Sequence, residues 1–302
     1  MDVIAQIRTA SSALKPRPTE TEAVLRPVPG IRVVLWDIYG TLLISASGDV
    51  GSADAQGRGT AMHQALRSIG LRPSGAPHAA AEQLLAAIKR FQHEVGMQGV
   101  PAPEVEIRQC WRDCCARLLA LGLLDSLPRE QDLAPLALAY ELASNPCWPM
   151  PDARRVLSAL QRAGLRQGII SNAQFYTPLL FPALFRAEIP DLGIDPELCW
   201  FSYEHLRAKP DTWLFRQALE RLAHRGIGAQ QCLYIGNDMR NDMLPASQMG
   251  LRTALFAGDA RSLRWRREHP QASTVQPDLV LTCLSQLPDC ILDHPVATKE
   301  HV

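Results

Sequence analysis

The sequence predicts a doubly wound parallel α/β sheet with a helical domain inserted into it. Short apolar runs rich in β-branched residues recur along the chain, such as VVLW at 33–36 and GII at 168–170. Such runs are typical of strands buried on both faces of a parallel sheet. After residue 150 they alternate with helical patterns, which implies right-handed crossovers between parallel strands. Residues 60–149 carry only helical patterns, which indicates an insertion.

The charge balance limits the partners of the protein. The 302 residues include 31 Lys and Arg against 31 Asp and Glu. A neutral chain lacks the excess of basic residues that a nucleic-acid or anionic membrane surface requires. No apolar run approaches the roughly 18 residues that span a bilayer, and the start of the chain lacks a signal peptide's hydrophobic centre. We therefore expect a cytoplasmic protein with no nucleic-acid and no membrane partner.

The first half of the chain comprises an arm, one strand and the insertion. Residues 1–30 are rich in Pro, Ser, Thr and charge, which favours a mobile or loosely docked arm. The run IRVVLW predicts the first strand, which ends at Asp37. The segment NPCWPMPD at 145–152 holds three prolines and predicts a stiff linker. Apolar residues at helical spacing predict four helices between them, at 61–70, 78–96, 104–124 and 133–143.

The second half of the chain carries the alternating pattern. Its amphipathic segments predict helices, and its short apolar runs predict strands. The helices are expected at 153–164 and 212–226, and the strands at 165–171, 197–202, 231–236, 252–256 and 278–282. In a doubly wound sheet the ligand lies at the carboxyl ends of the strands, so the residues there are the candidates for chemistry.

Four of these strand ends carry reactive side chains. A carboxylate, a hydroxyl with an amide, a cation and an acidic pair follow the strands in that order, and together they form a set that chance seldom produces. They are Asp37 in WDIYGTLL, Ser171 and Asn172 after LRQGII, Lys209 in RAKPD, and Asp238 and Asp242 in GNDMRND.

This set resembles the four motifs of the haloacid dehalogenase superfamily, most of whose members are magnesium-dependent phosphatases. The resemblance runs from about Ile31 to Leu284 and includes the place of a helical, C1-type cap between the first two motifs. It implies a Rossmann-like core and a small phosphorylated metabolite as the substrate. The implied division is an arm at 1–30, a core at 31–44 and 150–290, a cap at 45–149 and a tail at 291–302.

The resemblance also implies a role for each motif residue. Asp37 would attack phosphorus and form an aspartyl-phosphate, which water then hydrolyses. Thr41 and Ser171 would hold the phosphoryl oxygens, and Asn172 would orient the leaving end. Lys209 would offset the negative charge of the nucleophile and the phosphate.

The same resemblance implies Mg²⁺ as the cofactor. It places the ion against Asp37, the backbone carbonyl of Tyr39 and an acid of GNDMRND. Asn237 stands where the commonest form of that motif has its first aspartate, so we favour Asp238 as the ligand. Asn237 remains an alternative through its amide oxygen, and Asp242 would orient Lys209 or a metal-bound water.

One position departs from the phosphatase pattern. Most family phosphatases have an aspartate two residues after the nucleophile, which protonates the leaving alcohol and later activates water. Tyr39 takes this place, and a phenol with a pKa near 10 is a poor base at neutral pH. Asp49, in the glycine-rich segment SASGDVGSAD, is a candidate replacement, and its alternative role is that of an ordinary turn aspartate.

Tyr39 leaves two further functions open. L-2-haloacid dehalogenases resemble this chain in having tyrosine at that position, and they need no metal. They also have a tyrosine shortly after the lysine, where this chain has Phe215. They usually have Ser and Asn in place of the metal-binding acids, whereas this chain keeps Asp238 and Asp242. The third function is a binding protein that has lost turnover.

Other polar or aromatic residues are expected to be structural. Glu104 and Glu106 are expected to supply favourable charge at a helix N-terminus. Trp111 and Trp148 are expected to pack the cap and its hinge, and the alternative for either is to line the substrate entry. The basic run RSLRWRREHP at 261–270 is expected to form a solvated helix face. The oligomeric state is left open by the sequence.

Overall fold

The computed structural model describes residues 3–47 and 55–292. Within this part of the chain the main sheet has six parallel strands in the order β5-β4-β1-β6-β7-β8. β1 pairs with β4 on one side and with β6 on the other, so the strand order reverses at the centre of the sheet. The strands are β1 (Val33–Trp36), β4 (Arg166–Ser171), β5 (Cys199–Phe201), β6 (Cys232–Gly236), β7 (Arg252–Phe256) and β8 (Leu279–Leu281).

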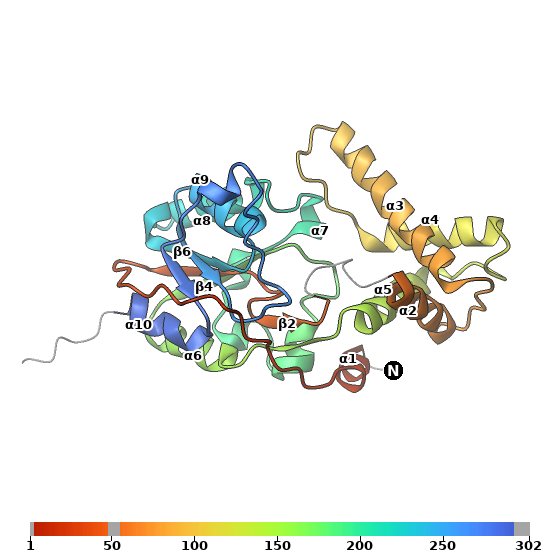
Figure 1. Ribbon diagram of the computed structural model, residues 1–302, viewed down its shortest axis with the longest axis horizontal. Helices are drawn as coiled ribbons and strands as arrows, with labels where there is room; N and C mark the ends of the chain where they lie inside the picture. The colour runs from red at the N-terminus through yellow and green to blue at the C-terminus, as the bar shows by residue number, and fades with distance from the viewer. Residues whose placement is uncertain (1–2, 48–54, 293–302) are drawn as a thin grey trace, which may run out of the picture.

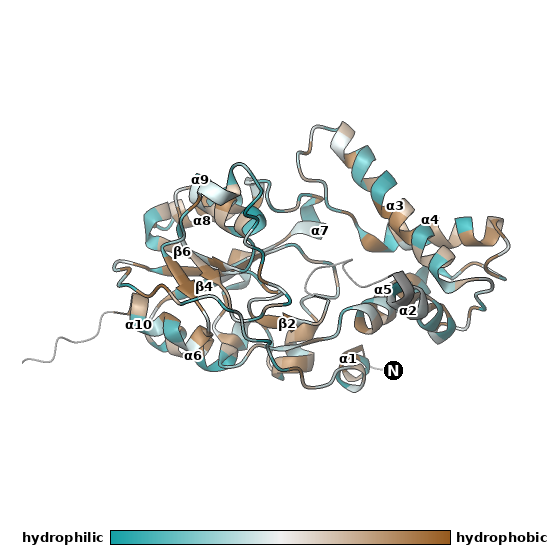
Figure 2. Cartoon of the chain, viewed as in Figure 1, coloured by the Kyte–Doolittle hydropathy of each residue, from teal (hydrophilic) through white to brown (hydrophobic). Residues whose placement is uncertain are grey.

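Helices cover both faces of the sheet, which confirms the doubly wound prediction (Figure 1). Alternate residues of β1 face opposite sides of the sheet. Val34 and Trp36 join the apolar cluster beneath α6 (Ala153–Arg162) and α10 (Leu287–Ile291), and Val33 and Leu35 join the cluster beneath α8 (Trp213–Ala223). The strands are mostly apolar whereas the covering helices have one polar side (Figure 2). Two further helices of the core, α7 (Ser202–His205) and α9 (Leu244–Gln248), follow strands β5 and β6.

Four helices between β1 and β4 form a separate bundle, which we call the helical insertion (55–144; Figure 1). They pack around their own apolar cluster, in which Trp111, Cys114 and Leu136 are fully buried. This cluster explains why the segment carries helical spacing without strand patterns. The helices are α2 (Ala55–Ser68), α3 (Pro77–Met97), α4 (Ile107–Ala120) and α5 (Leu133–Ser144).

The two connections to the helical insertion pair with each other. β2 (Leu43–Ser45) and β3 (Cys147–Pro149) form an antiparallel ribbon. The sequence predicted only a stiff linker here, because a three-residue strand is too short to show an alternating pattern. The ribbon fixes the point at which both connections leave the core.

The N-terminal segment is not the loosely docked arm that its composition predicted. A helix, α1 (Val3–Ala10), buries Ile7 completely, and Arg8 donates hydrogen bonds to the carbonyl oxygens of Pro182 and Ala183. Farther along, Val24 pairs with Val280 of β8 and covers that edge of the sheet. Composition missed this docking because it depends on a few apolar residues among many polar ones. Among the described residues, no helix has the length and apolarity needed to cross a membrane.

Candidate active site

Asp37 lies directly after the central strand β1, at the point where the strand order reverses. Its Oδ1 atom accepts a hydrogen bond from Ser171 Oγ at 2.8 Å and one from Lys209 Nζ at 2.7 Å. No described residue donates to its Oδ2 atom. Because Ser171 ends the neighbouring strand β4, the sheet itself brings this hydroxyl and the carboxylate together. The structure thus gathers the predicted nucleophile, hydroxyl and cation at one edge.

Lys209 uses all three of its ammonium hydrogens within this cluster. Besides Asp37, it donates to Asp242 Oδ1 at 2.6 Å and to Tyr234 OH at 2.8 Å. Burial lowers the pKa of Lys209, but the carboxylates of Asp242 and Asp37 outweigh that effect and raise the pKa above its usual 10.5. The lysine therefore stays charged at neutral pH. The sequence did not single out Tyr234, although a tyrosine in a wholly buried strand needs a hydrogen-bond partner.

Asn172 holds the backbone of Lys209. Its Oδ1 atom accepts from the Lys209 N–H at 2.7 Å, and its Nδ2 atom donates to the Lys209 carbonyl at 3.2 Å. The amide therefore fixes the position from which the lysine side chain reaches Asp37. This contact adds a positioning role to the leaving-end role that the sequence assigned to Asn172.

Asp242 is the organising carboxylate of the loop after β6. Its Oδ2 atom accepts from the backbone N–H groups of Asn237 and Asp238 at 3.0 and 2.9 Å, while its Oδ1 atom binds Lys209. A Cβ at Gly236 would lie only 2.4 Å from Asp242 Cγ, so a glycine is needed for this close approach. Burial raises the pKa of Asp242, an effect that the charge of Lys209 opposes.

The structure separates the two candidate metal ligands of this loop. Asn237 packs against the loop that carries Asp37: its Oδ1 atom accepts from Thr41 Oγ1 at 3.3 Å, and a Cβ at Gly40 would come within 2.9 Å of it. Asp238 instead pairs with Arg266 at 2.6 Å and caps the turn that follows it. Thr41, assigned to a phosphoryl oxygen from the sequence, therefore faces Asn237.

Arg266 lies in the basic run at 261–270, and this run is not the solvated helix face that the sequence predicted. No helix spans it, and its backbone pairs with that of motif residues, since Met239 N–H donates to the Arg264 carbonyl and Arg264 N–H to the Asn237 carbonyl. The run thus braces the loop after β6. The spacing of charges within the run cannot predict this contact, because Asp238, the partner of Arg266, lies in a different segment of the chain.

Tyr39 does not point its hydroxyl at the nucleophile. The hydroxyl is 2.9 Å from Thr177 Oγ1, and burial raises the pKa of the phenol well above 10. The residue therefore stays protonated at neutral pH and offers no base. Asp49, the proposed replacement, lies outside the described residues.

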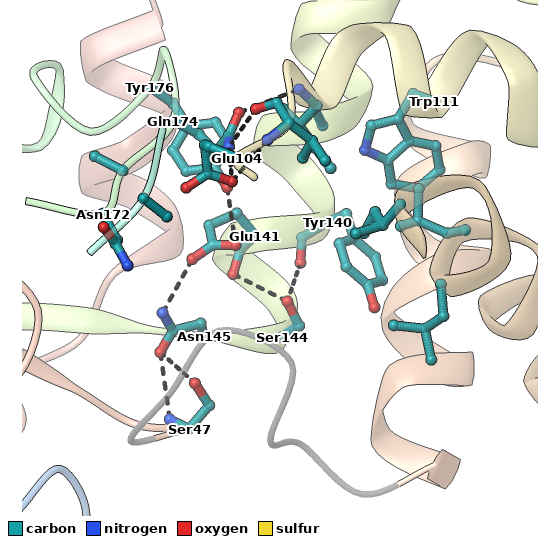
Figure 3. Close-up of a pocket in the computed structure, with 18 of the residues that line it drawn as sticks. Ser47, Glu104, Trp111, Tyr140, Glu141, Ser144, Asn145, Asn172, Gln174 and Tyr176 are labelled. Atoms are coloured by element: carbon teal, nitrogen blue, oxygen red, sulfur yellow. Dashed lines mark hydrogen bonds between the residues drawn. The ribbon is translucent and has the colours of Figure 1, made fainter. Parts of the chain in front are cut away.

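A cavity of about 330 Å³ lies between the helical insertion and the core (Figure 3). Tyr39 and Asn172 line one side of it, and each lies within two residues of Asp37 or Ser171. Two carboxyl groups, Glu104 and Glu141, line it as well. This volume is at the lower end of the range for small-molecule sites, so the cavity fits a small molecule close to Asp37 and Ser171.

Glu141, at the end of α5, ties the helical insertion to the core. It accepts hydrogen bonds from Tyr176 OH at 3.1 Å and from Asn145 Nδ2 at 3.0 Å. Asn145 in turn accepts from Ser45 Oγ and Ser47 Oγ on the first connection. The sequence missed Glu141, because a single acid in an apolar helix shows nothing of the neighbours it meets.

Glu104 is not at a helix N-terminus, whereas Glu106 caps α4 as expected. Glu104 accepts from Ser202 Oγ at 2.7 Å and from the Val105 N–H at 2.9 Å. Its backbone N–H donates to the Leu206 carbonyl, just before the loop that bears Lys209. The segment between α3 and α4 therefore docks directly on the core beside the loop that bears Lys209.

Burial raises the pKa of Glu141 above its usual 4.5, and no lysine or arginine among the described residues forms an ion pair with it. Its contribution to stability is therefore complete below pH 4.5 and is lost as the pH rises through the raised value. We expect Glu141→Gln, which has no proton to lose, to gain stability relative to the wild type as the pH increases. Thermal unfolding of both proteins from pH 4 to pH 8 measures this difference. A difference that is constant with pH would contradict the assignment.

The oxygen donors beside Asp37 suit a Mg²⁺ ion. A carboxylate oxygen without a described donor, a backbone carbonyl and the amide oxygen of Asn237 are all hard ligands, and Mg²⁺ typically takes one or two carboxylates together with waters and substrate phosphate. Among the described residues no three His, Cys, Asp or Glu side chains are grouped to hold a metal by themselves. The residues therefore fit an ion that shares its coordination with substrate.

Comparison with known proteins points to one family. Residues 31–250 match the family model of haloacid dehalogenase-like hydrolases. A ribulose-1,5-bisphosphate 5-phosphatase of Halopiger xanaduensis is 29% identical over 175 residues, which is 57% of this chain and 69% of that protein. The rhythmically expressed gene 2 protein of Drosophila melanogaster is 26% identical over 159 residues, 51% of this chain and 58% of its own length.

A solved structure supports the fold. The 2-haloacid dehalogenase from Pseudomonas syringae pv. Tomato DC3000 superposes with a TM-score of 0.55 and 19% identity, covering 86% of this chain and 97% of that one. At this identity the likeness concerns the fold alone.

Proposed function

Because this chain belongs to the haloacid dehalogenase-like hydrolases, we propose that it hydrolyses a small phosphate monoester through an aspartyl-phosphate on Asp37. The observation that carries the proposal is the buried cluster of Asp37, Ser171, Lys209 and Asp242 at the central edge of the sheet. The cluster supplies a nucleophile, a hydroxyl donor and a fixed positive charge, which are the groups that phosphoryl transfer requires.

Each side chain of the cluster has a separate role in the proposed reaction. Ser171 and Lys209 hold Oδ1 of Asp37, which leaves Oδ2 to attack phosphorus. As that bond forms, the bond between phosphorus and the alcohol oxygen of the substrate breaks, and the alcohol leaves with a proton taken from water. Lys209 offsets the charge of the carboxylate and the phosphate, and Asp242 keeps the lysine aimed at them. Asn172 fixes the lysine backbone. Water then attacks the aspartyl-phosphate and releases phosphate.

Mg²⁺ is the proposed cofactor, held by Asp37, the Tyr39 carbonyl and the amide oxygen of Asn237. When bound, it would offset the repulsion between the carboxylate and the phosphate. We propose Asn237 as the ligand in place of Asp238, because Arg266 already pairs with the Asp238 carboxylate.

The assignment of the ligand is tested by two alanine variants. Asn237→Ala should raise the Mg²⁺ concentration for half-maximal activity by about tenfold or more, because it removes an oxygen ligand. Asp238→Ala should leave that concentration unchanged and instead lower stability by roughly 1–2 kcal/mol, through the lost cap and ion pair. Magnesium titration of activity and chemical unfolding measure the two effects. The reverse pattern would identify Asp238 as the ligand.

Two observations favour phosphate over haloacid substrates. The Halopiger xanaduensis relative is named as a phosphatase, and it matches over more than half of this chain. Glu104 and Glu141 line the cavity, and among its described lining residues only Arg58 is basic. A 2-haloacid would have to place its own carboxylate among these acids, whereas a phosphate monoester directs its anionic end toward Lys209.

Tyr39 favours a second candidate, metal-independent dehalogenation of a 2-haloacid. That reaction needs no acid for the leaving halide, and Tyr39 offers neither acid nor base to the nucleophile.

One assay separates the two candidates. Phosphate release from p-nitrophenyl phosphate should depend on Mg²⁺ and stop with EDTA, and this leaving group needs little protonation, so Tyr39 should not mask the activity. Halide release from L-2-chloropropionate should be absent. Halide release that persists with EDTA, without phosphate release, would overturn the phosphatase proposal in favour of the dehalogenase.

A further inference from the structure

The amide of Asn237, the proposed Mg²⁺ ligand, is held in one orientation by the loop after β7 (257–262). Its Nδ2 atom donates to the Ser262 carbonyl at 2.6 Å, and its Oδ1 atom accepts from Thr41 Oγ1 at 3.3 Å. Because a carbonyl oxygen can only accept, the amide nitrogen must face Ser262, and the amide oxygen is then turned toward Thr41. Hydrogen bonds to the rest of a ligand side chain commonly alter metal affinity by about tenfold or more. The Ser262 carbonyl therefore sets the direction in which Asn237 presents its oxygen.

Ser262 lies between the loop that carries Asn237 and the loop that carries Asp37. It is only 1% exposed, and a Cβ at Gly40 would come within 2.5 Å of Ser262 Cβ. Its Oγ atom has no hydrogen-bond partner among the described residues, although a buried hydroxyl without one costs stability. The side chain therefore does not hold Ser262 in place through a hydrogen bond of its own, and other contacts of its loop must do so.

Asp259 shapes the turn that leads to Ser262. Its carboxylate is fully buried and pairs with the Arg261 guanidinium at 2.8 Å. The Oδ1 atom also accepts from the Arg261 N–H at 3.1 Å, and the Asp259 carbonyl accepts from the Ser262 N–H at 3.1 Å. The position of Ser262 thus depends on that of Asp259.

The N-terminal segment 15–19 docks on this turn from a remote part of the chain. Its backbone and one of its hydroxyls form hydrogen bonds along the turn. The bonds run from the Arg17 N–H to Asp259 Oδ1 at 3.2 Å, from the Ala260 N–H to the Arg17 carbonyl at 2.9 Å, from Thr19 Oγ1 to the Ala257 carbonyl at 2.8 Å, and from the Arg261 side chain to the Lys15 carbonyl at 2.6 Å. Both the segment and the turn lie outside residues 31–250, so the contact is not part of what the family model describes.

We propose that residues 15–19 are a positioning element of the Mg²⁺ site: they hold the turn that carries Ser262, and Ser262 aims the Asn237 amide oxygen at the ion. The proposal rests on the proposed function and adds to it a structural determinant of Mg²⁺ affinity. No side chain of the segment is assigned a contact with the ion or the substrate, so Thr19 acts through the turn alone. Removing its hydrogen bond should therefore weaken Mg²⁺ binding without removing a ligand.

Mg²⁺ binding to the substrate-free protein, followed by titration calorimetry, tests the proposal independently of activity. Thr19→Val removes the hydroxyl that donates to Ala257 and should raise the Mg²⁺ dissociation constant by about threefold or more, because the turn that carries Ser262 is then held less firmly. Thr19→Ser keeps the hydroxyl and should bind Mg²⁺ as the wild type does. Asp259→Asn weakens both the ion pair with Arg261 and the docking, and should have a larger effect.

Two substitutions in α1 are the matched controls. Thr9→Val removes a hydroxyl that donates to the Ala5 carbonyl of the same helix. Arg8→Met removes the hydrogen bonds to the carbonyl oxygens of Pro182 and Ala183, which dock α1 at another place on the core. Neither should change the Mg²⁺ dissociation constant, although Arg8→Met should lower the melting temperature.

The coupling is reciprocal, because a contact that favours Mg²⁺ binding is itself favoured by bound Mg²⁺. Saturating Mg²⁺ should therefore slow hydrogen exchange at the Arg17 and Ala260 N–H groups by about threefold or more. Mass spectrometry of peptic peptides that contain these residues measures the exchange rates in the wild type and in Asn237→Ala, where the protection should disappear.

The proposal would be overturned by a Thr19→Val variant that binds Mg²⁺ as the wild type does, by an equal loss in Thr9→Val, or by exchange rates that Mg²⁺ leaves unchanged. A lower melting temperature or turnover with an unchanged Mg²⁺ dissociation constant would show that the segment only stabilises the fold. Protection that persists in Asn237→Ala would show that the coupling does not pass through that amide. Failure of the proposed function appears separately, as absence of p-nitrophenyl phosphate hydrolysis by the wild type, and leaves the binding and exchange measurements decisive.

Discussion

Asp37→Asn is expected to lower the turnover of p-nitrophenyl phosphate by at least about 1,000-fold, because an amide oxygen is not a nucleophile toward phosphorus. The substitution should preserve the fold. An amide oxygen at the position of Oδ1 still accepts from Ser171 and Lys209, which are the two bonds that this carboxylate receives from the described residues. Steady-state kinetics and thermal unfolding measure the two quantities.

The control for this variant is Asp113→Asn. That carboxylate lies on α4 with its side chain about half exposed, and it pairs with Arg90 of α3 at the surface. Its loss should leave turnover unchanged and lower stability only slightly, because exposed ion pairs contribute little. Turnover by Asp37→Asn within about tenfold of the wild type would show that another group attacks the substrate.

Lys209→Met is expected to abolish turnover and to lower the free energy of unfolding by roughly 3–5 kcal/mol, the cost of leaving buried charges without their partner. The lysine side chain is only 3% exposed and contacts both Asp37 and Asp242. Methionine matches its length but leaves two carboxylates close together in a buried site. Chemical unfolding at neutral pH measures the loss.

The pairing of Lys209 with two carboxylates also predicts how a second substitution should affect stability. In Lys209→Met/Asp242→Asn one of the two unpaired charges is gone, so stability should recover in part while activity stays absent. Lys89→Met, on the exposed side of α3, is the control and should cost little. A double variant less stable than Lys209→Met would contradict the view that the two carboxylates repel each other.

The architecture could be predicted because buried parallel strands leave a strong local signal. The run around Val33 to Trp36 is wholly apolar and ends at an acid, and the strands at 166–171, 232–236 and 252–256 each contain a short apolar run. Reactive side chains at strand ends were found for the same reason, since the fold brings such ends to one edge. Asp37, Ser171 and Lys209 meet there as predicted.

The remaining parts of the site depend on contacts between distant segments. Arg266 reaches Asp238 from the basic run, and Glu141 meets Tyr176 from a different part of the chain. The two partners of each pair have no characteristic spacing along the chain, so no sequence pattern predicts these contacts. The ribbon of β2 and β3 was missed for a different reason, since its strands are too short to show periodicity.

The central claim, covalent catalysis by Asp37, is tested most directly by acid quenching of the wild type during turnover of p-nitrophenyl phosphate with Mg²⁺, followed by peptide mass spectrometry. The account predicts a phosphoryl group on the peptide that contains Asp37, removable by hydroxylamine and absent from Asp37→Asn. Steady phosphate release with no phosphoryl group on that peptide at any quench time would contradict it, and would show that water attacks the substrate directly.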